Sequence, residues 1–529
     1  MPVILRRSDQ ATTAGYDSWV VLSGDPASLP RERRRPGVGL KLEAAFDQCA
    51  EQWFAIGKAL SGDPSSALAH TPACVTNASD FGTMLAWTKL INEWAGEDAK
   101  TLVICDDPWL YRHLKNWPGV DAGRPPRLWP AALRLFVRGY AARAKTVITV
   151  LRRIWTYGHR PTPGAKGGQW LLAYGHPYSD AEGKDAYFGD LLQIYPGLRR
   201  ILHVDCIDPL LAKLTRHPGT VSLNGWGNWR YAFSLPFARW RPARRHLQGP
   251  YGWLVARAAA REGGTGTAAM IRWQNHCQQR WLTDMAPVLV AWPWENHSWE
   301  RSFVRRAHAL GIGTVGYQHS MVGRHMLNYA PLSNVDYLAS IPDRVLCIGA
   351  PYYAQLAKWS MPEERLQIAG AFRFSGPAKC SFDTSAPVFA ALPFAGAVGA
   401  EMMSAIRAAA KDGIRFLVKP HPMLPMTFED TPGFERTDAP LPEQGAVSGV
   451  LYAASAVGLE AYFAGIPTLR FVAEQVVAID ILPENVSVPF AGRDDISGAF
   501  SDLPRPSPVP REQVFADVNY GVWAAIFAE

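Results

Sequence analysis

One pattern recurs along most of the chain: a short apolar run, a break of polar or small residues, and then a stretch with helical periodicity. It is clearest over residues 285–311, where the apolar run PVLVAW precedes the polar break and the helical stretch. The same pattern occurs in residues 101–117, 169–180, 199–214, 312–320, 344–359, 387–394, 414–422 and 448–472. Apolar runs that alternate with helices are typical of βα units around a parallel sheet. The pattern therefore predicts an α/β fold.

The length of the chain predicts more than one domain. It has 529 residues, whereas single hydrophobic cores stop growing at about 250–300 residues. The βα units fall into two groups, so we expect two Rossmann-like domains, at residues 1–340 and 341–505. A proline-rich stretch then precedes residues 506–529, a tail or helix that could cross back to the first domain.

Charge and cysteine content restrict the environment and the partners. The 54 basic and 47 acidic residues leave a net charge of +7, which suits a phosphorylated donor, an anionic acceptor or an anionic membrane face. No nucleic-acid motif occurs, so no nucleic-acid partner is expected. Seven widely spaced cysteines without a CxxC pair indicate reduced thiols. With no signal-peptide pattern and no apolar run of about 20 residues, we expect a cytoplasmic protein, soluble or peripheral at the inner face of the inner membrane.

One segment departs from the βα pattern. Residues 130–160 form a basic amphipathic insertion, and residues 130–155 within it contain six cations, Arg134, Arg138, Arg143, Lys145, Arg152 and Arg153. A basic amphipathic helix or hairpin can lie on an anionic membrane. An ordinary surface helix with a solvated basic face gives the same pattern, and both interpretations stay open at this level.

Two neighbouring motifs carry the strongest chemical signal. Lys419, His421 and Pro422 follow the predicted strand IRFLV, and Ser455, Gly458 and Glu460 follow the next predicted strand, about 30 residues on. Small residues where a strand meets a helix let backbone N–H groups approach a phosphate, which the helix dipole also favours. A nearby histidine or lysine can balance charge on a departing nucleotide, and a glutamate one turn into the helix can reach ribose hydroxyls. These six residues are therefore candidates for binding a nucleotide.

In this order and spacing the two motifs resemble the nucleotide-binding domain of GT-B glycosyltransferases of bacterial surface-carbohydrate biosynthesis. More narrowly, they resemble enzymes that use CMP-activated ulosonic acids, such as the Kdo transferases of capsule and lipopolysaccharide. Those enzymes carry a His-Pro motif and a later Ser/Thr pair that hold the CMP phosphate. His421-Pro422 matches the first motif and Ser455 the first member of the pair, but Ala456 replaces the second. This departure leaves other nucleotides open.

A third motif places a carboxylate at a predicted strand end. Glu295 follows the run PVLVAW and precedes a helix for which Ser298 is a suitable N-cap. Sugar transfer needs a carboxylate as general base or as nucleophile. The segment resembles an acidic motif in the first domain of the same transferases, which implies a catalytic Glu295. A carboxylate that caps its own helix is the alternative.

Further polar residues follow other predicted strands. His319 lies in a Gln-His-Ser sequence that resembles one near the interdomain cleft of these families, where it would act with Glu295 or bind the donor. A satisfied histidine in a tight turn is the alternative. In the first half, His176 and Asp185 resemble an acceptor-side loop and are weaker candidates for contacting acceptor hydroxyls.

Several absent motifs exclude other enzyme classes. The chain has no Asp-x-Asp triplet, HExxH motif or cysteine/histidine cluster, so we expect a metal-independent enzyme with no metal site and no cofactor beyond the nucleotide-sugar. It has no Walker loop or strand-linked GxGxxG, which argues against a kinase or a dehydrogenase, and no GxSxG elbow of hydrolases.

The sequence and the resemblance together predict a GT-B glycosyltransferase that moves Kdo or a related ulosonic acid from its CMP-activated form. The expected acceptor is a lipid-linked or oligosaccharide form of a bacterial surface polysaccharide. A CDP-polyol phosphotransferase of the teichoic-acid type, a nucleotide-sugar epimerase and a non-catalytic polysaccharide assembly subunit remain alternatives.

Overall fold

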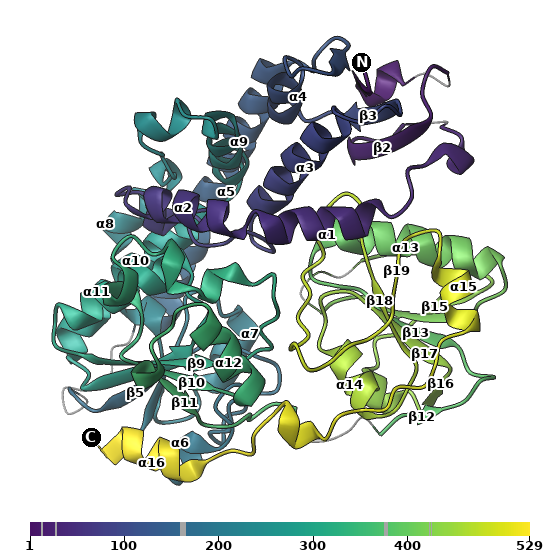
Figure 1. Ribbon diagram of the computed structural model, residues 1–529. Coiled ribbons are helices and arrows are strands. Elements are labelled where there is room, and N and C mark those ends of the chain that lie inside the picture. Colours follow the sequence, from purple (N-terminus) through teal and green to yellow (C-terminus); the bar gives the residue numbers. More distant parts are fainter. Residues whose placement is uncertain are drawn as a thin grey trace.

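The computed structural model describes residues 1–11, 14–26, 29–158, 166–374, 379–422, 424 and 426–528. Over these residues the chain forms parallel sheets of four, seven and six strands, with a further pair of short strands, β12 (Ser381–Phe382) and β16 (Ala446–Val447). Helices pack around the three large sheets (Figure 1). The predicted α/β fold is therefore confirmed.

The first 122 residues build a sheet of their own, which the sequence analysis did not separate from the first domain. Its strands run in the order β2-β3-β1-β4. They are β1 (Val3–Arg6), β2 (Ser18–Ser23), β3 (Thr101–Cys105) and β4 (Val120–Ala122). The helices beside them are α1 (Val38–Gln48), α2 (Ala50–Ser61), α3 (Phe81–Trp94) and α4 (Pro108–Leu114). A separate hydrophobic core built around Phe46, Trp53 and Trp87 holds this N-terminal unit together.

The seven-stranded sheet has the order β11-β10-β9-β8-β5-β6-β7. Its strands are β5 (Gln169–Ala173), β6 (Arg199–Leu202), β7 (Thr220–Ser222), β8 (Leu289–Pro293), β9 (Gly313–Gln318), β10 (Arg344–Cys347) and β11 (Leu366–Ile368). The surrounding helices are α6 (Leu191–Ile194), α7 (Asp208–Leu214), α10 (Thr267–Met285), α11 (Ser298–His308) and α12 (Ala350–Lys358). The strand order reverses between β5 and β8, as in a Rossmann sheet.

The six-stranded sheet repeats this topology, with the order β15-β14-β13-β17-β18-β19. Its strands are β13 (Val388–Ala391), β14 (Phe416–Lys419), β15 (Phe434–Arg436), β17 (Gly449–Tyr452), β18 (Thr468–Phe471) and β19 (Phe490–Ala491). Its helices are α13 (Gly396–Lys411), α14 (Val457–Phe463) and α15 (Ile496–Ser501). Here the order reverses between β13 and β17, so each large sheet has one switch point.

The boundary predicted at residues 340/341 falls inside the seven-stranded sheet. Strand β10 pairs with β9, and β11 pairs with β10, whereas the six-stranded sheet begins only at Val388. The connection from β9 to β10 runs through three short 3₁₀ turns, which gives it the sequence pattern of a linker. The C-terminal helix α16 (Tyr520–Ala528) lies beside the seven-stranded sheet (Figure 1), where the buried Trp523 ring is 5.4 Å from the Tyr317 ring.

The basic segment is one continuous helix, α5 (Leu128–Tyr157), not a hairpin. Two of its six cations face inward: Arg143 donates to the carbonyl of Gly263 at 2.6 Å, and Arg153 pairs with Asp208 at 2.9 Å. The last few residues assigned to the insertion, 159 and 160, lie outside the described residues. Among the helices that are described, none is both long enough and apolar enough to cross a bilayer.

A buried ion pair joins the N-terminal unit to the six-stranded sheet. Glu43 of α1 accepts two hydrogen bonds from Arg470 of β18, at 2.9 and 2.8 Å, and both side chains are less than 10% exposed. Arg324, from the loop after β9, reaches the same carboxylate at 3.2 Å. One acidic side chain thus connects all three units.

Replacing Glu43 with alanine should strongly destabilise the protein. The substitution leaves the Arg470 guanidinium buried without its carboxylate, and removing one partner of a buried pair costs about 3–5 kcal/mol. Urea unfolding followed by tryptophan fluorescence measures the loss. Glu51→Ala, at an exposed position on α2, is the matched control and should change the unfolding free energy by no more than about 0.5 kcal/mol. Equal effects of the two substitutions would contradict this role for Glu43.

Candidate functional site

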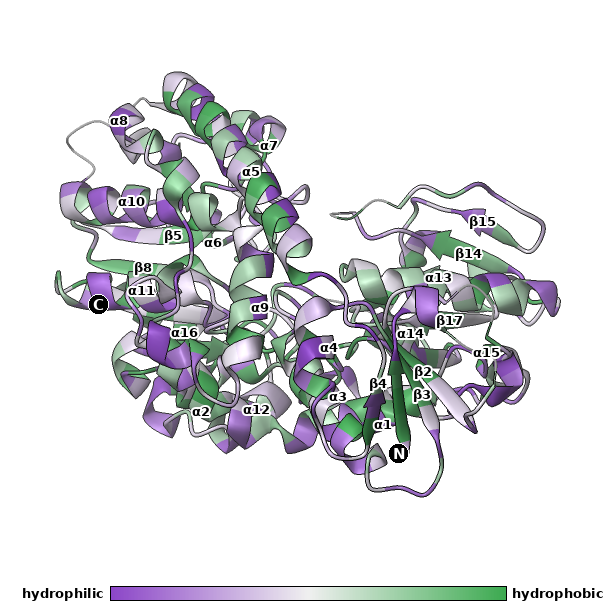
Figure 2. Cartoon of the chain, turned by 90° about the horizontal axis from the view of Figure 1, so that it is seen from above, coloured by the Kyte–Doolittle hydropathy of each residue, from purple (hydrophilic) through white to green (hydrophobic). Residues whose placement is uncertain are grey.

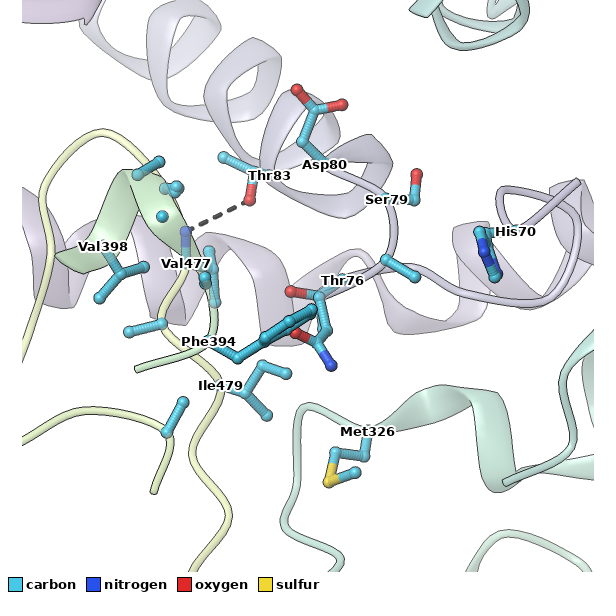
Figure 3. A pocket seen from close by; sticks show the side chains of 18 of the residues that line it. His70, Thr76, Ser79, Asp80, Thr83, Met326, Phe394, Val398, Val477 and Ile479 are labelled. Atoms are coloured by element: carbon cyan, nitrogen blue, oxygen red, sulfur yellow. Dashed lines mark hydrogen bonds between the residues drawn. The ribbon is translucent and has the colours of Figure 1, made fainter. Parts of the chain in front are cut away.

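A cavity of about 860 Å³ lies where the three units meet. Figure 3 shows side chains from each unit around it: Thr76, Ser79 and Asp80 from the N-terminal unit, Met326 from the loop after β9, and Phe394 and Ile479 from the six-stranded unit. The dashed line in the figure is a hydrogen bond across two units, from the backbone N–H of Val477 to Thr83 Oγ1 at 3.2 Å. A hydrogen bond therefore connects the N-terminal unit and the six-stranded unit at the cavity wall.

Both switch points open onto this cavity. Glu295 follows β8, beside the reversal of the seven-stranded sheet, and lines the wall. Residues 394–398 follow β13, and Ala454 and Ala456 follow β17, on the two sides of the reversal in the six-stranded sheet. Ligands of open α/β sheets bind in the crevice at the carboxyl ends of the strands, at such a reversal. The topology thus marks this cavity as the candidate site.

The six-stranded side of the cavity presents a helix N-terminus. Ala395, Gly396 and Ala397, at the start of α13, form part of the wall. The first N–H groups of a helix have no partner within the helix and carry a partial positive charge. Because these three residues have at most a methyl side chain, the backbone is accessible to a ligand, and this wall can bind an anion such as a phosphate.

Of the six predicted nucleotide-binding residues, one lines the cavity. His421 lines the cavity, and its ring lies 5.5 Å from the ring of Phe394. Burial lowers the pKa of His421, and the charge of Lys419 lowers it further. Lys419, Pro422, Ser455, Gly458 and Glu460 are not among the residues that line the wall.

Two of these residues, Ser455 and Gly458, have roles within the fold. Ser455 Oγ accepts from the backbone N–H of Val457 at 3.4 Å and so supports the start of α14. A Cβ atom at Gly458 would lie 2.4 Å from the Tyr452 ring, so glycine is needed there for close packing. Burial raises the pKa of Glu460, and Arg373 opposes the increase.

Arg373 is a wall residue that the sequence analysis missed. It lies after β11, in the connection between the two large sheets, and lines the cavity. Its guanidinium carbon is 5.8 Å from the centre of the Tyr187 ring and 5.5 Å from that of Phe374. Its charge lowers the pKa values of both His319 and Glu460. Arg373 thus affects residues that belong to both large sheets. A cation in this position can bind an anionic ligand that contacts both sheets.

Glu295 is held as an ion. Its Oε2 is 2.7 Å from His297 Nε2, and its Oε1 is 3.9 Å from His319 Nε2. Burial raises the pKa of Glu295, but the hydrogen bond and charge of His297, with the charges of His319 and His70, hold the pKa at about 2. About a third of the side chain is exposed, so an ionised carboxylate faces the cavity.

The local sequence explains how Glu295 is left available. His297, not Ser298, is the N-cap of α11, and Glu300 completes a capping box with it. Glu300 also accepts from the backbone N–H of Glu295 at 3.0 Å and from Trp292 Nε1 at 2.9 Å. Burial raises the pKa of Glu300 to about 7. Because Glu300 caps the helix, the capping alternative for Glu295 does not hold.

His319 lies behind Glu295, not on the wall. Its side chain is almost completely buried, and its ring meets the Tyr187 ring edge-on at 4.9 Å. Burial lowers the pKa of His319 to about 4, so the imidazole is neutral at pH 7. His319 therefore lies near Glu295 but is not among the residues that line the cavity.

The two weaker acceptor candidates, His176 and Asp185, lie in different surroundings. His176 is half-buried beside Tyr187, with ring centres 5.8 Å apart, but it does not line the cavity. Asp185 is buried and pairs with Arg200 at 3.1 Å, and it also accepts from the backbone N–H of Tyr187 at 2.9 Å. Asp185 therefore shapes the loop beside Tyr187 and cannot contact an acceptor in this structure.

The N-terminal unit supplies a wall that sequence reasoning did not anticipate. His70, Thr76, Ser79 and Asp80 all line the cavity. Asp80 accepts two hydrogen bonds from Arg257 of α9 (Gly252–Gly263), each 2.7 Å long, and these help to hold its pKa at about 2 against the effect of burial. Hydroxyl, imidazole and carboxylate groups opposite the anion-binding wall can bind a polyhydroxylated ligand.

Over the part of the chain that the structure describes, no group of three or more His, Cys, Asp or Glu side chains is placed to hold a metal ion.

No known protein family profile matches the chain, and no curated protein matches its sequence. Among solved structures, it is similar to UDP-GlcNAc 2-epimerase from Neisseria meningitidis bound to UDP-GlcNAc, with 11% identity over 68% of this chain and 100% of that one and a TM-score of 0.41. It is also similar to the glycosyltransferase SnogD from Streptomyces nogalater (12% identity, 68% and 99% covered, TM-score 0.34) and to the calicheamicin glycosyltransferase CalG4 (15% identity, 66% and 94% covered, TM-score 0.37). Similarities of this size carry no argument about activity or substrate.

Proposed function

We propose that this protein is a GT-B glycosyltransferase that transfers a sugar from a nucleotide-activated donor to an acceptor hydroxyl in the cavity between its sheets. The observation that carries the proposal is the position of the two switch points. One presents an ionised carboxylate and the other an anion-binding helix N-terminus, and both line the same cavity.

The six-stranded wall suits the donor. The start of α13 supplies partial positive charge and Arg373 full positive charge to the cavity wall, which His421 also lines. A nucleotide leaving the anomeric carbon takes the bonding electron pair and gains negative charge on its phosphate. Hydrogen-bond donors and positive charges that already point toward the phosphate stabilise this charge without reorganisation. These groups would therefore lower the barrier to departure of the nucleotide.

The opposite wall suits the acceptor. As the acceptor oxygen bonds to the anomeric carbon, its hydroxyl proton becomes strongly acidic, and Glu295 can accept it. A pKa of about 2 makes Glu295 a weak base that takes the proton late, once the new bond has formed to a large extent. The same negative charge stabilises an oxocarbenium-like transition state. His297 keeps the carboxylate ionised and in place through its hydrogen bond.

For the donor, we propose a CMP-activated ulosonic acid such as Kdo, and for the acceptor a bacterial surface polysaccharide or its lipid-linked precursor. The His421-Pro422 match supports CMP, because His421 lines the cavity, and Arg373 offers a partner for the carboxylate that such a sugar carries. Transfer would need no metal, because protein groups supply the positive charge. A CDP-polyol phosphotransferase would use the same wall for a diphosphate, but it has less need of a glutamate held ionised opposite that wall.

Nucleotide selectivity should show in thermal stability. CMP should raise the unfolding temperature more than CDP, UDP, GDP or ADP, because a ligand that binds only the native state stabilises it by about 2.7 kcal/mol at a hundredfold excess over Kd. His421→Ala should weaken the effect at least tenfold in CMP concentration. His217→Ala, which does not line the cavity, is the control. Selective stabilisation by CDP would favour polyol-phosphate transfer. No response to any nucleotide would favour the assembly subunit.

Glu295→Gln should reduce transfer from CMP-Kdo at least a hundredfold while leaving CMP affinity within a factor of two. The amide cannot accept the acceptor proton at neutral pH, whereas the nucleotide wall is unchanged. Radiolabelled sugar transfer and calorimetric CMP titration measure the two quantities. Glu182→Gln, at an exposed position in the same unit, should behave as wild type. Full activity in Glu295→Gln would exclude the catalytic assignment.

The ionised state of Glu295 should be visible in the pH dependence of stability. Its folded-state pKa of about 2 lies below the ordinary value of 4.5, so ionisation contributes stability above pH 4.5 that is lost as the pH falls toward 2. After a discount for the exposed part of the side chain, Glu295→Gln should cost about 1–2 kcal/mol at pH 7 and much less at pH 3. Urea unfolding at both pH values tests this, with the exposed Glu93→Gln as control. A difference that does not change with pH would contradict it.

A further inference from the structure

Helix α5 presents an apolar stripe to solvent along nearly its whole length. Large apolar side chains of this helix are more than half exposed, among them Trp129 (68%), Phe136 (52%), Ile148 (71%) and Trp155 (89%). The other exposed apolar residues of the helix are Leu133, Val137 and Tyr140. At about 3.6 residues per turn, spacings of three, four, seven and eight residues, with one adjacent pair, keep them on one side. Figure 2 shows α5 as a long helix that runs from the top of the view toward the middle of the molecule, with hydrophobic residues distributed along it.

A second group of exposed rings continues the stripe. Trp229, Phe233 and Phe237 lie in and just after α8 (Trp229–Ala232), and each is more than half exposed. The Phe237 ring lies 6.3 Å from the ring of Tyr140 on α5. Monomeric proteins rarely expose a continuous apolar patch of this extent unless it binds something. We call these ten residues the α5 patch.

The charges beside the α5 patch select the partner. Helix α5 contains no acidic residue. Four of its cations, Arg134, Arg138, Lys145 and Arg152, are exposed, and helical spacing places them along one flank of the stripe. Tryptophan and tyrosine are the residues that favour the interface between lipid and water. An apolar face with aromatic residues and a basic flank is complementary to an anionic bilayer surface.

The same helix reaches the candidate site. Leu135 and Arg138 of α5 line the large cavity. A membrane in contact with the α5 patch would therefore lie next to the cavity, where a sugar acceptor carried on a lipid headgroup could enter. The patch and the site are thus parts of one continuous surface.

We propose that the α5 patch docks on an anionic membrane surface and thereby presents the cavity to a lipid-linked acceptor. The docking follows from the patch alone, whereas the lipid-linked acceptor rests on the proposed function. The helix lies in the plane of the interface: the apolar stripe enters the headgroup region, and Arg134, Arg138 and Lys145 contact anionic headgroups, while Arg152 also pairs with Asp208.

Vesicle co-sedimentation tests the docking. The full chain should sediment with vesicles of 70% phosphatidylcholine and 30% phosphatidylglycerol and not with pure phosphatidylcholine, and raising the salt from 0.05 to 0.5 M should weaken binding severalfold, because salt screens the charge attraction. Phe136→Glu combined with Val137→Glu should reduce binding at least tenfold. Val288→Glu combined with Leu310→Glu, two exposed apolar sites away from the patch, is the matched control and should bind as wild type.

Three results would overturn the docking: no binding of the wild-type chain to anionic vesicles, equal loss in the two double variants, or a soluble dimer that Phe136→Glu with Val137→Glu disrupts while vesicles are ignored. Circular dichroism and the unfolding temperature verify that each variant is folded.

The same double variant separates the docking from the proposed function. In Phe136→Glu with Val137→Glu, CMP stabilisation and transfer to a water-soluble acceptor should match wild type, while transfer to an acceptor embedded in vesicles falls at least tenfold. Undiminished transfer to the embedded acceptor would refute the lipid-linked acceptor. Vesicle binding without any response to nucleotides would instead refute the proposed function and leave the docking in place.

Discussion

A parallel sheet whose strand order reverses leaves a crevice at the carboxyl ends of its central strands, because the connections on either side turn away from each other. Here two such sheets open onto one cavity, one through Glu295 and the other through residues 394–398. The N-terminal unit holds this arrangement in place, since Glu43 binds Arg470 and Thr83 binds the backbone of Val477. The chemistry of the cavity depends on that fixed geometry.

Two carboxylates five residues apart illustrate how environment divides their roles. Both are affected by burial, yet Glu295 has a pKa of about 2 and Glu300 one of about 7. Histidine side chains surround Glu295 and favour its charged form. Glu300 instead lies under the turn and accepts from backbone N–H groups and from Trp292. Groups whose pKa values are separated in this way commonly perform different tasks, here a reactive carboxylate and a structural one.

The sequence predicted what periodicity and strand ends can show. The βα pattern gave the α/β fold, and the strand-end rule found Glu295 and His421, both on the cavity wall. It could not find Arg373, which lies in a connection without a motif, nor the N-terminal unit, whose strands β2 and β3 pair across a long helical insertion. Arg143 and Arg153 were counted as surface cations because only packing against Gly263 and Asp208 shows that they are buried. The predicted boundary at residues 340/341 is wrong because β10, which follows it in the sequence, pairs in the same sheet with β9, which precedes it.

The proposed function requires a donor nucleotide to lie between the two switch points. Hydrogen–deuterium exchange of the full chain, with and without saturating CMP, tests it most directly. We expect slower exchange at the backbone amides of residues 394–398 and around His421, where the nucleotide phosphate and base would exclude solvent, and little change in the outer strands of either sheet. Protection elsewhere in the chain, with these amides unchanged while CMP is bound, would contradict this position of the nucleotide.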